Sequence, residues 1–278
     1  MYVQRREAPV ITMTAPTASE HNLLLNALPD DARQRLLPYL ELVYVPRGKT
    51  IHEAGEKLRY AYFPIDAIVA LLNTTEVGVS TEISMVGNEG MVGVSIFTGG
   101  HATLSRAVVQ QGGNMYRLLS KRLTDEFDRH GDLLALLLRY TWTLMIQVGQ
   151  TAMCNRYHTI DQQLCRLVLQ SLDRLRGDEL MITQEHIAAM LGVRRESITE
   201  AVGRMKQLGL IQCHRGKVKV LNRPGIEARC CECYAVITTE CDHVLRESRQ
   251  VGYPVPGVGV HLCSGGLEVK YPHTYARR

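Results

Sequence analysis

Thr183 to Ile211 reads T-Q-E-H-I-A-A-M-L-G-V-R-R-E-S-I-T-E-A-V-G-R-M-K-Q-L-G-L-I. Thr183 is a residue type that caps helices, and Gly192 stands where a chain leaving a helix needs a positive φ. Between them, the apolar residues share one helical face: Ile187, Ala188 and Leu191. After the glycine, a second apolar stripe has helical spacing: Ile198, Ala201, Val202 and Met205. The stretch therefore predicts two short helices joined by a tight corner, a helix-turn-helix.

The segment from Gly192 to Arg223 is strongly basic. Its net charge is +6, whereas the whole chain has a net charge of +4. The cations are Arg194, Arg195, Arg204, Lys206, Arg215, Lys217, Lys219 and Arg223. A basic segment on a nearly neutral chain is typical of phosphate binding, so the pattern favours DNA binding over a helical hairpin that belongs to some other core.

The sequence around the two helices predicts a winged domain. Leu210 to Leu221 alternates apolar and polar residues across a His214-Arg215-Gly216-Lys217 turn, the pattern of a β-hairpin. Upstream, Thr159-Ile160-Asp161-Gln162 matches a capping box that opens a supporting helix. We expect one more helix from Ile226 to Glu247.

The composition is that of an ordinary globular protein, with 45% apolar and 22% charged residues over 278 positions. No run of eighteen or more apolar residues appears, and the first 20 residues lack a hydrophobic signal core. We expect a cytoplasmic protein that does not contact a membrane. The sequence contains no phosphate-binding loop and no hydrolase motif, so we do not expect an enzyme.

The first half of the chain predicts a β-domain. After a short helix expected over Leu28 to Leu40, the stretch from Leu42 to about Tyr116 contains short β-rich segments separated by turn signals. This spacing is typical of a jelly-roll barrel, although an open sheet is the alternative. From Leu118 to Cys154 the pattern is helical.

Leu133 to Val148 is apolar on nearly all sides. A helix with two apolar faces can bury one against its own barrel and the other against a twin helix in a homodimer. The alternative is a central core helix of a monomer. Together these segments predict an α+β chain: an N-terminal jelly-roll β-barrel, a long dimerisation helix and a C-terminal winged helix-turn-helix. We expect a flexible tail (1–20), a sensor barrel (21–130), the dimerisation helix (131–155), the DNA-binding domain (156–226), and a C-terminal helix and tail (227–278).

This order of elements resembles the Crp/Fnr family of bacterial transcription regulators, whose barrel is similar to cyclic-nucleotide-binding domains. The resemblance is most specific at Val45 to Pro64 (V-P-R-G-K-T-I-H-E-A-G-E-K-L-R-Y-A-Y-F-P) and at Leu191 to Glu200 (L-G-V-R-R-E-S-I-T-E). It implies a cytoplasmic homodimer that regulates transcription, with double-stranded DNA and RNA polymerase as partners.

The resemblance also implies which side chains contact DNA. Arg195 and Glu196 occupy the positions that read bases, since Arg can pair with guanine and Glu can accept from cytosine. Phosphate contacts are expected from Ser197, Thr199, Arg204, Lys206, Arg215 and Lys217. Arg194 and Glu200 complete the expected DNA-binding set, but both depart from the family pattern, which leaves the preferred DNA sequence open.

The barrel departs from the family's cyclic-nucleotide motif. Gly93 is followed by Val94 rather than an acid, and Arg106 is followed by Ala107. Arg106 is thus only a weak candidate for a ligand contact, and the effector is unknown. No cysteine precedes Cys154, so the iron–sulfur sensor near the N-terminus of some relatives is not expected. We predict no cofactor.

The C-terminal cysteines Cys230, Cys231, Cys233 and Cys241 have metal-ligand chemistry, but they do not form the two short-spaced pairs of a usual zinc site. We therefore expect them to pack in a core and predict no metal site. Two alternative functions remain: a metal- or redox-responsive regulator that uses these cysteines, and a protein-binding module that does not bind DNA.

Overall fold

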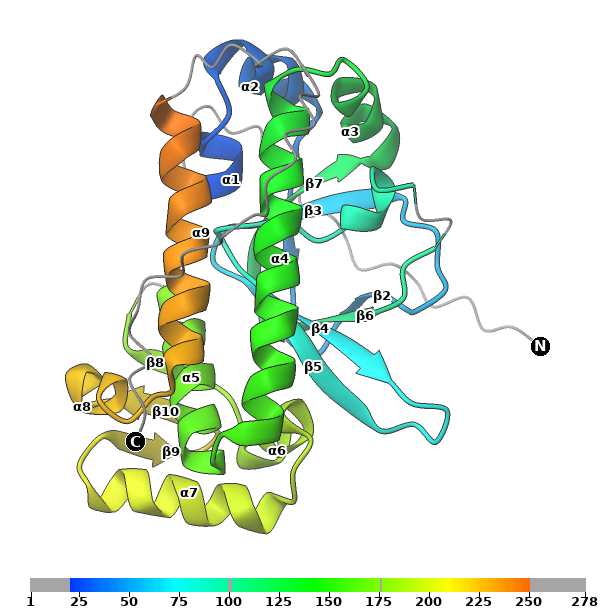
Figure 1. Ribbon diagram of the computed structural model, residues 1–278. Coiled ribbons are helices and arrows are strands. Elements are labelled where there is room, and N and C mark those ends of the chain that lie inside the picture. The colour runs from blue at the N-terminus through cyan, green and yellow to red at the C-terminus, as the bar shows by residue number, and fades with distance from the viewer. Residues whose placement is uncertain (1–20, 100–101, 176, 251–278) are drawn as a thin grey trace, which may run out of the picture.

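The computed structural model describes residues 21–99, 102–175 and 177–250. The predicted tails, 1–20 and the part after residue 250, lie outside them. An N-terminal β-sandwich lies beside the long helix α4 (Asp132–Tyr157), and helix α9 (Glu232–Gln250) runs back along α4 (Figure 1). A smaller domain at the lower end of α4 carries helix α7 (Arg195–Gln207). The predicted α+β fold class is confirmed.

Two antiparallel sheets form the sandwich, with strand orders β1-β7-β3 and β2-β6-β4-β5. The strands are β1 (Glu41–Val45), β2 (Thr50–His52), β3 (Tyr60–Pro64), β4 (Ile68–Thr74), β5 (Ser80–Val86), β6 (Arg106–Gln111) and β7 (Gly113–Leu119). The sequence placed the change to helix at Leu118, but β7 continues to Leu119 because Leu118 and Leu119 pair with Ala61 and Tyr60 of β3. Short helices α1 (Leu23–Asn26) and α3 (Ser120–Phe127) flank the sheets.

The helix expected over Leu28 to Leu40 is shorter than predicted. Helix α2 spans Asp30–Leu36 and is followed by a 3-10 turn over Leu37–Tyr39. Pro38 lies in that turn, and its missing N–H prevents the α-helical hydrogen-bond pattern from continuing.

Helix α4 buries one side and exposes the other. Its inward residues pack with the sandwich and with α9: Leu133, Leu136, Leu137 and Tyr140. On the outward side, Leu138, Trp142 and Met145 keep 53%, 56% and 61% of their surface exposed. The helix ends at Tyr157, and Thr159 caps the next helix through the predicted capping box with Gln162.

Within the described residues, the smaller domain combines helices with a three-stranded sheet of order β8-β10-β9. Its elements are α5 (Ile160–Asp173), β8 (Glu179–Met181), α6 (Gln184–Leu191), α7, β9 (Ile211–His214) and β10 (Lys217–Val220). The hairpin of β9 and β10 is the predicted wing. Strand β8, which the sequence analysis did not identify, pairs with β10 on its other edge.

The single helix expected from Ile226 to Glu247 is wrong. The chain forms α8 (Arg223–Glu227), turns, and then begins α9 at Glu232. The Asn222 side chain caps α8 and Pro224 stands in its first turn, so α8 starts earlier than predicted. The break after α8 lets Cys231 and Cys233 turn toward the end of α4, where both are buried.

Polar side chains are buried where α4 and α5 meet the sandwich. Arg174 at the end of α5 pairs with Glu89 at 2.7 Å between Nε and Oε1, and both side chains are largely buried. Arg166 of α5 donates to Thr151 of α4 at 3.3 Å. Glu82 of β5 is buried nearby, and this burial raises its pKa to about 8 although Arg166 and Arg174 favour its ionised form.

Among the described residues, no helix combines the length and the apolar character that crossing a membrane requires.

The Glu82→Gln variant tests the buried carboxyl. The pKa of Glu82 is raised above its value of 4.5, so the folded state holds the proton and loses stability as the pH rises from about 5 to about 8. Glutamine carries no such titration. The free energy of unfolding of the variant, taken relative to that of the wild type, should therefore rise by roughly a few kcal/mol over this interval. Denaturant titrations at both pH values measure it. Exposed Glu76→Gln is the control, and parallel pH profiles for Glu82→Gln and wild type would contradict the assignment.

Candidate nucleic-acid interface

The corner between α6 and α7 has the geometry that its sequence predicts. The hydroxyl of Thr183 accepts a hydrogen bond from the backbone N–H of His186 at 3.2 Å, which caps α6. Gly192 adopts φ of 66°, and the N–H of Val193 donates to the carbonyl of Ala188 at 3.1 Å. These contacts end α6 and aim α7 across the domain.

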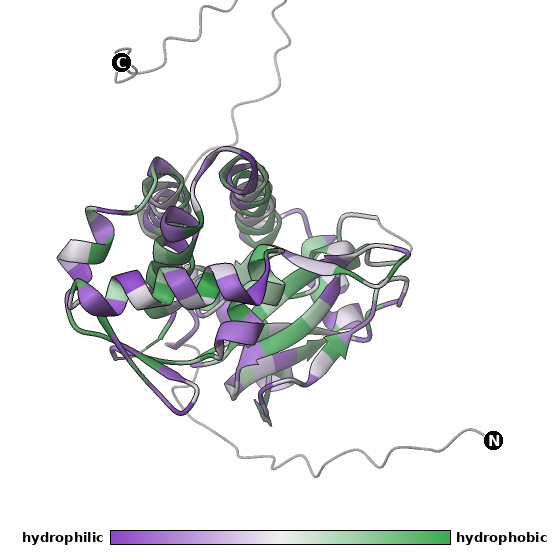
Figure 2. Cartoon of the chain, turned by 90° about the horizontal axis from the view of Figure 1, so that it is seen from below, coloured by the Kyte–Doolittle hydropathy of each residue, from purple (hydrophilic) through white to green (hydrophobic). Residues whose placement is uncertain are grey.

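Helix α7 separates a buried face from an exposed one. Ile198, Ala201, Val202 and Met205 are buried in the core that α5, α6 and the wing share. The opposite side of the helix faces solvent at the lower end of the molecule. Figure 2 looks at this end, where α7 crosses in front of the other elements and hydrophilic residues cover much of its visible side.

Four cations of the basic segment are exposed and have no acidic partner. Within the residues that the structure describes, the side chains of Arg194, Arg195, Lys206 and Arg215 make no ion pair and no hydrogen bond. Arg194 and Arg195 lie at the start of α7, Lys206 in its last turn, and Arg215 at the tip of the wing. These side chains are therefore free to contact an anionic partner.

The other four cations pair with acids that lie outside the basic segment. Arg204 contacts Asp161 of α5 at 2.7 Å, and this hydrogen bond raises its pKa. Arg223 contacts Asp173 at 2.6 Å. Two weaker pairs involve the wing, Lys217 with Glu179 at 3.6 Å and Lys219 with Asp178 at 3.5 Å. The local charge of +6 thus overstates the charge available to a ligand.

The remaining predicted contacts also lie on or beside α7. Thr199 donates to Gln184 of α6 at 2.9 Å, so its hydroxyl helps to fix the two helices together. The carboxylate of Glu200 lies 3.9 Å from the guanidinium of Arg204, which is one turn further along α7. Glu196 is exposed next to Arg195, and Ser197 is half-buried.

The wing is a tight hairpin. Arg215 and Gly216 have positive φ values of 44° and 78°, as the two central residues of a type I′ turn require. Val218 and Val220 are buried, while Lys217 is exposed, as predicted. The turn therefore holds Arg215 away from the domain core.

The domain is docked on the sandwich. Helix α6 packs against β5, and the hydroxyl of Thr81 donates to the carbonyl of Met190 at 3.2 Å. Ile68 and Met85 of the sandwich belong to the same hydrophobic core as α5, α6 and α7. The direction of α7 is thus fixed relative to the sandwich.

Arg106, the weak candidate for a ligand contact, is engaged within the sandwich. It pairs with Glu53 at 3.1 Å and donates to Thr50 at 3.0 Å. A cavity of about 320 Å³ lies nearby, and its lining includes Leu71, Val92 and His52 but not Arg106. Its walls are mainly apolar, which does not match an anionic ligand.

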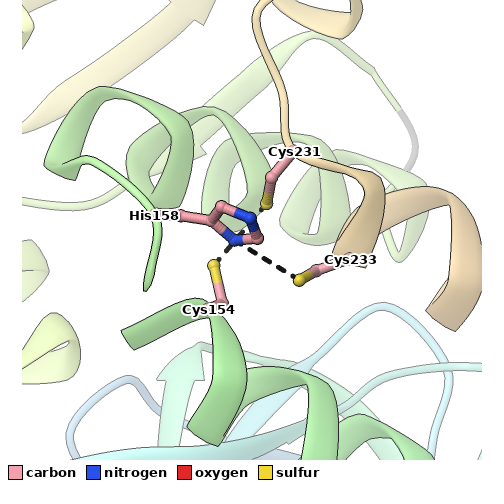
Figure 3. A group of neighbouring side chains, drawn as sticks. All are labelled: Cys154, His158, Cys231 and Cys233. Atoms are coloured by element: carbon pink, nitrogen blue, oxygen red, sulfur yellow. Dashed lines mark hydrogen bonds between the residues drawn. The ribbon is translucent and has the colours of Figure 1, made fainter. Parts of the chain in front are cut away.

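The C-terminal cysteines do not all lie together, because Cys241 lies apart from the other three. Cys231 and Cys233 lie beside Cys154 and His158 at the end of α4, with all four ligand atoms within 4.8 Å of one another (Figure 3). Hydrogen bonds from the thiols of Cys154 and Cys230 lower the pKa of Cys231. Cys241 lies further along α9, beside Tyr140 and Arg174. The sequence analysis missed Cys154 and His158, whose four-residue spacing at a helix end was the available signal.

Comparison with known proteins finds a family model that matches the smaller domain and solved structures that are similar in fold. The family model of the Crp-like helix-turn-helix domain matches residues 162–229. No curated protein matches the chain.

Several solved structures share the fold. The c-di-GMP-responsive global regulator CLP of Xanthomonas campestris superposes with a TM-score of 0.56 at 14% identity, over 70% of this chain and 100% of that one. A Crp/Fnr-family transcriptional regulator from Thermus thermophilus gives 0.53 at 18% identity, over 68% and 97%. FixK2 of Bradyrhizobium japonicum gives 0.55 at 12% identity, over 69% and 98%.

The corner of the helix-turn-helix can be tested by exchanging glycines. Gly192→Ala places a Cβ in the left-handed region, 3.3 Å from the hydroxyl of Thr81, and should destabilise the protein by about 1–2 kcal/mol. Gly203→Ala lies within α7, where a Cβ meets nothing within 4 Å, and should stabilise it by roughly 0.5–1 kcal/mol. Denaturant unfolding measures both, and a stabilising Gly192→Ala would refute the corner geometry.

Proposed function

We propose that this chain, which carries a Crp-like helix-turn-helix domain on the fold of Crp/Fnr transcription regulators, regulates transcription as a homodimer bound to double-stranded DNA. The observation that carries the proposal is the exposed face of α7, where Arg194, Arg195 and Lys206 lack protein partners among the described residues. Such unpaired cations on a helix flanked by a wing suit phosphate and base contacts.

The start of α7 reads the base sequence. Arg195 and Glu196 occupy its first turn and are both exposed, so they reach furthest into a major groove that receives the helix. The Arg195 guanidinium donates two hydrogen bonds to guanine, and the Glu196 carboxylate accepts one from cytosine.

Phosphate contacts surround this reading position. Arg194, Lys206 and Arg215 supply unpaired charge. Arg204 and Lys217 bind phosphate only after they release their ion-pair partners, Asp161 and Glu179 respectively. Ser197 and Thr199 contribute hydroxyl groups, and Glu200 lies beside Arg204. Arg204 therefore contributes less to affinity than its position on α7 suggests.

Two copies of the chain pair through α4. The exposed stripe of Leu138, Trp142, Met145 and Val148 recurs at helical spacing and is covered by neither the sandwich nor α9. A twin helix on this stripe places two α7 helices on one face of DNA, about 34 Å apart for half-sites one helical turn from each other. A cytoplasmic location and contact with RNA polymerase accompany this function.

A module that binds an acidic protein surface instead of DNA is the competing function. The two differ in salt dependence, because DNA binding releases condensed counterions and protein binding does not. Selection of preferred duplexes from a random pool, followed by fluorescence anisotropy over a range of salt concentrations, tests the proposal. Equal affinity for all duplexes and for unrelated polyanions would overturn it.

Two substitutions separate base reading from phosphate binding. Arg195→Ala should cost about 1–3 kcal/mol on the selected duplex and flatten the preference at one base pair. Arg215→Ala should weaken all duplexes alike and reduce the salt slope by about 1. Anisotropy against a panel of single-base variants measures both effects. If the two variants lose affinity uniformly, the assigned roles are wrong.

The dimer seam is tested with Met145→Glu, which places a charge in the exposed apolar stripe of α4. Sedimentation should show a shift from dimer to monomer at micromolar concentration, with weaker DNA binding, because a buried unpaired charge is strongly unfavourable. Tyr44→Glu is the matched control, since Tyr44 is 68% exposed and lies on β1 rather than on α4. A wild-type protein that remains monomeric with and without DNA would exclude the proposed seam.

A further inference from the structure

Four side chains with metal-binding chemistry converge where α4 ends and α9 begins. Cys154 lies in the last turn of α4 and His158 directly follows that helix, while Cys231 and Cys233 flank the first residue of α9. Their three sulfurs and one imidazole nitrogen all lie within 4.8 Å of one another, and the three cysteines are buried (Figure 3).

The separations match those of ligands around one small ion. The sulfurs of Cys154 and Cys231 are 3.6 Å apart, and the sulfur of Cys233 is 3.5 Å from Nδ1 of His158. With zinc–sulfur and zinc–nitrogen bonds of about 2.3 and 2.0 Å, a tetrahedral site separates two sulfurs by about 3.8 Å and a sulfur from a nitrogen by about 3.5 Å. An iron–sulfur cluster attaches its cysteines to different irons and requires a wider set.

The histidine is already oriented for a metal. Its Nε2 lies 3.3 Å from the carboxylate of Glu232, and its Nδ1 faces Cys233. A proton on Nε2, on the side of the Glu232 carboxylate, leaves the lone pair on Nδ1, which is the arrangement by which carboxylates orient metal-binding histidines.

A buried cation balances the charge of the set. Three thiolates, one neutral imidazole and one divalent ion carry a net charge of −1. Arg166 of α5 is buried and interacts electrostatically with Cys154 and Cys233. Its Nε atom has no hydrogen-bond partner among the described residues. The guanidinium charge therefore offsets the excess negative charge of an occupied site.

We propose that Cys154, His158, Cys231 and Cys233 bind one Zn²⁺ ion in a closed tetrahedral site. Soft thiolates with one imidazole favour zinc over magnesium or calcium, and four protein ligands leave no open position for catalysis. The ion joins the end of α4 to the start of α9. Its ligand His158 directly precedes Thr159, which caps α5. It thus stabilises the junction from which the DNA-binding domain extends.

Metal content and cobalt spectroscopy test the site in the full chain. Protein purified under reducing conditions should contain about one zinc per chain by elemental analysis. After removal of the zinc by a chelator, Co²⁺ should give thiolate charge-transfer bands and the strong visible bands of tetrahedral cobalt. Re-addition of Zn²⁺ should displace the cobalt and raise the melting temperature, because the metal binds only the folded arrangement.

Variants identify the ligands. Cys154→Ser and His158→Ala should lose stoichiometric zinc and the cobalt bands, whereas His158→Cys should restore both by supplying a fourth thiolate. Glu232→Gln should keep the bands and weaken the affinity about 10–100-fold. Cys241→Ser is the matched control and should bind as the wild type does.

Folding of each variant is followed by circular dichroism. The Glu232→Gln affinity, measured by competition with a chromophoric chelator, provides a test in a variant that keeps all four ligands. The proposal fails if reduced wild-type protein binds Zn²⁺ no better than Cys154→Ser, or if Cys241→Ser loses the metal as well.

Discussion

The packing of α4 between the sandwich and α9 is the contact on which the rest of the molecule depends. Tyr140 donates from its hydroxyl to the carbonyl of Met91 at 2.8 Å, and its ring lies against Gly90, where a Cβ would approach within 2.4 Å. Gly90 is therefore required for the helix to approach the sheet. On the other side, Val244 of α9 completes the same core. The end of α4 determines where α5 starts, and α5 supports α7.

The sequence predicted the helix-turn-helix well because its determinants are local. A cap at Thr183, a positive φ at Gly192 and a stripe of apolar residues each act within a few positions of the chain. The charge available at the surface was predicted less well. Arg204 and Arg223 lie close in the sequence to the other cations, but α5 supplies their acidic partners Asp161 and Asp173. Such long-range pairing has no local signal.

The cysteine set illustrates the same limit. Cys154 and Cys231 are separated by 77 positions and meet only because α9 runs back along α4. That path depends on the break between α8 and α9, which the sequence analysis read as one continuous helix. With a continuous helix, the spacing of the cysteines does not suggest a shared site. The extent of the β-rich stretch was predicted more closely, except at the end of β7, where the pairing of Leu118 and Leu119 with β3 overrides the local helical pattern.

The position of α9 also has a consequence for the order in which the protein folds during its synthesis. Among the described elements α9 leaves the ribosome last, yet Val244 covers the buried face of α4, which was made about 100 residues earlier. Until then, Leu133, Leu136 and Tyr140 are left partly uncovered on a nascent chain whose α4 already displays a second apolar stripe. An apolar face exposed on an unfinished chain favours association between copies, and the packing of α9 against α4 covers that face.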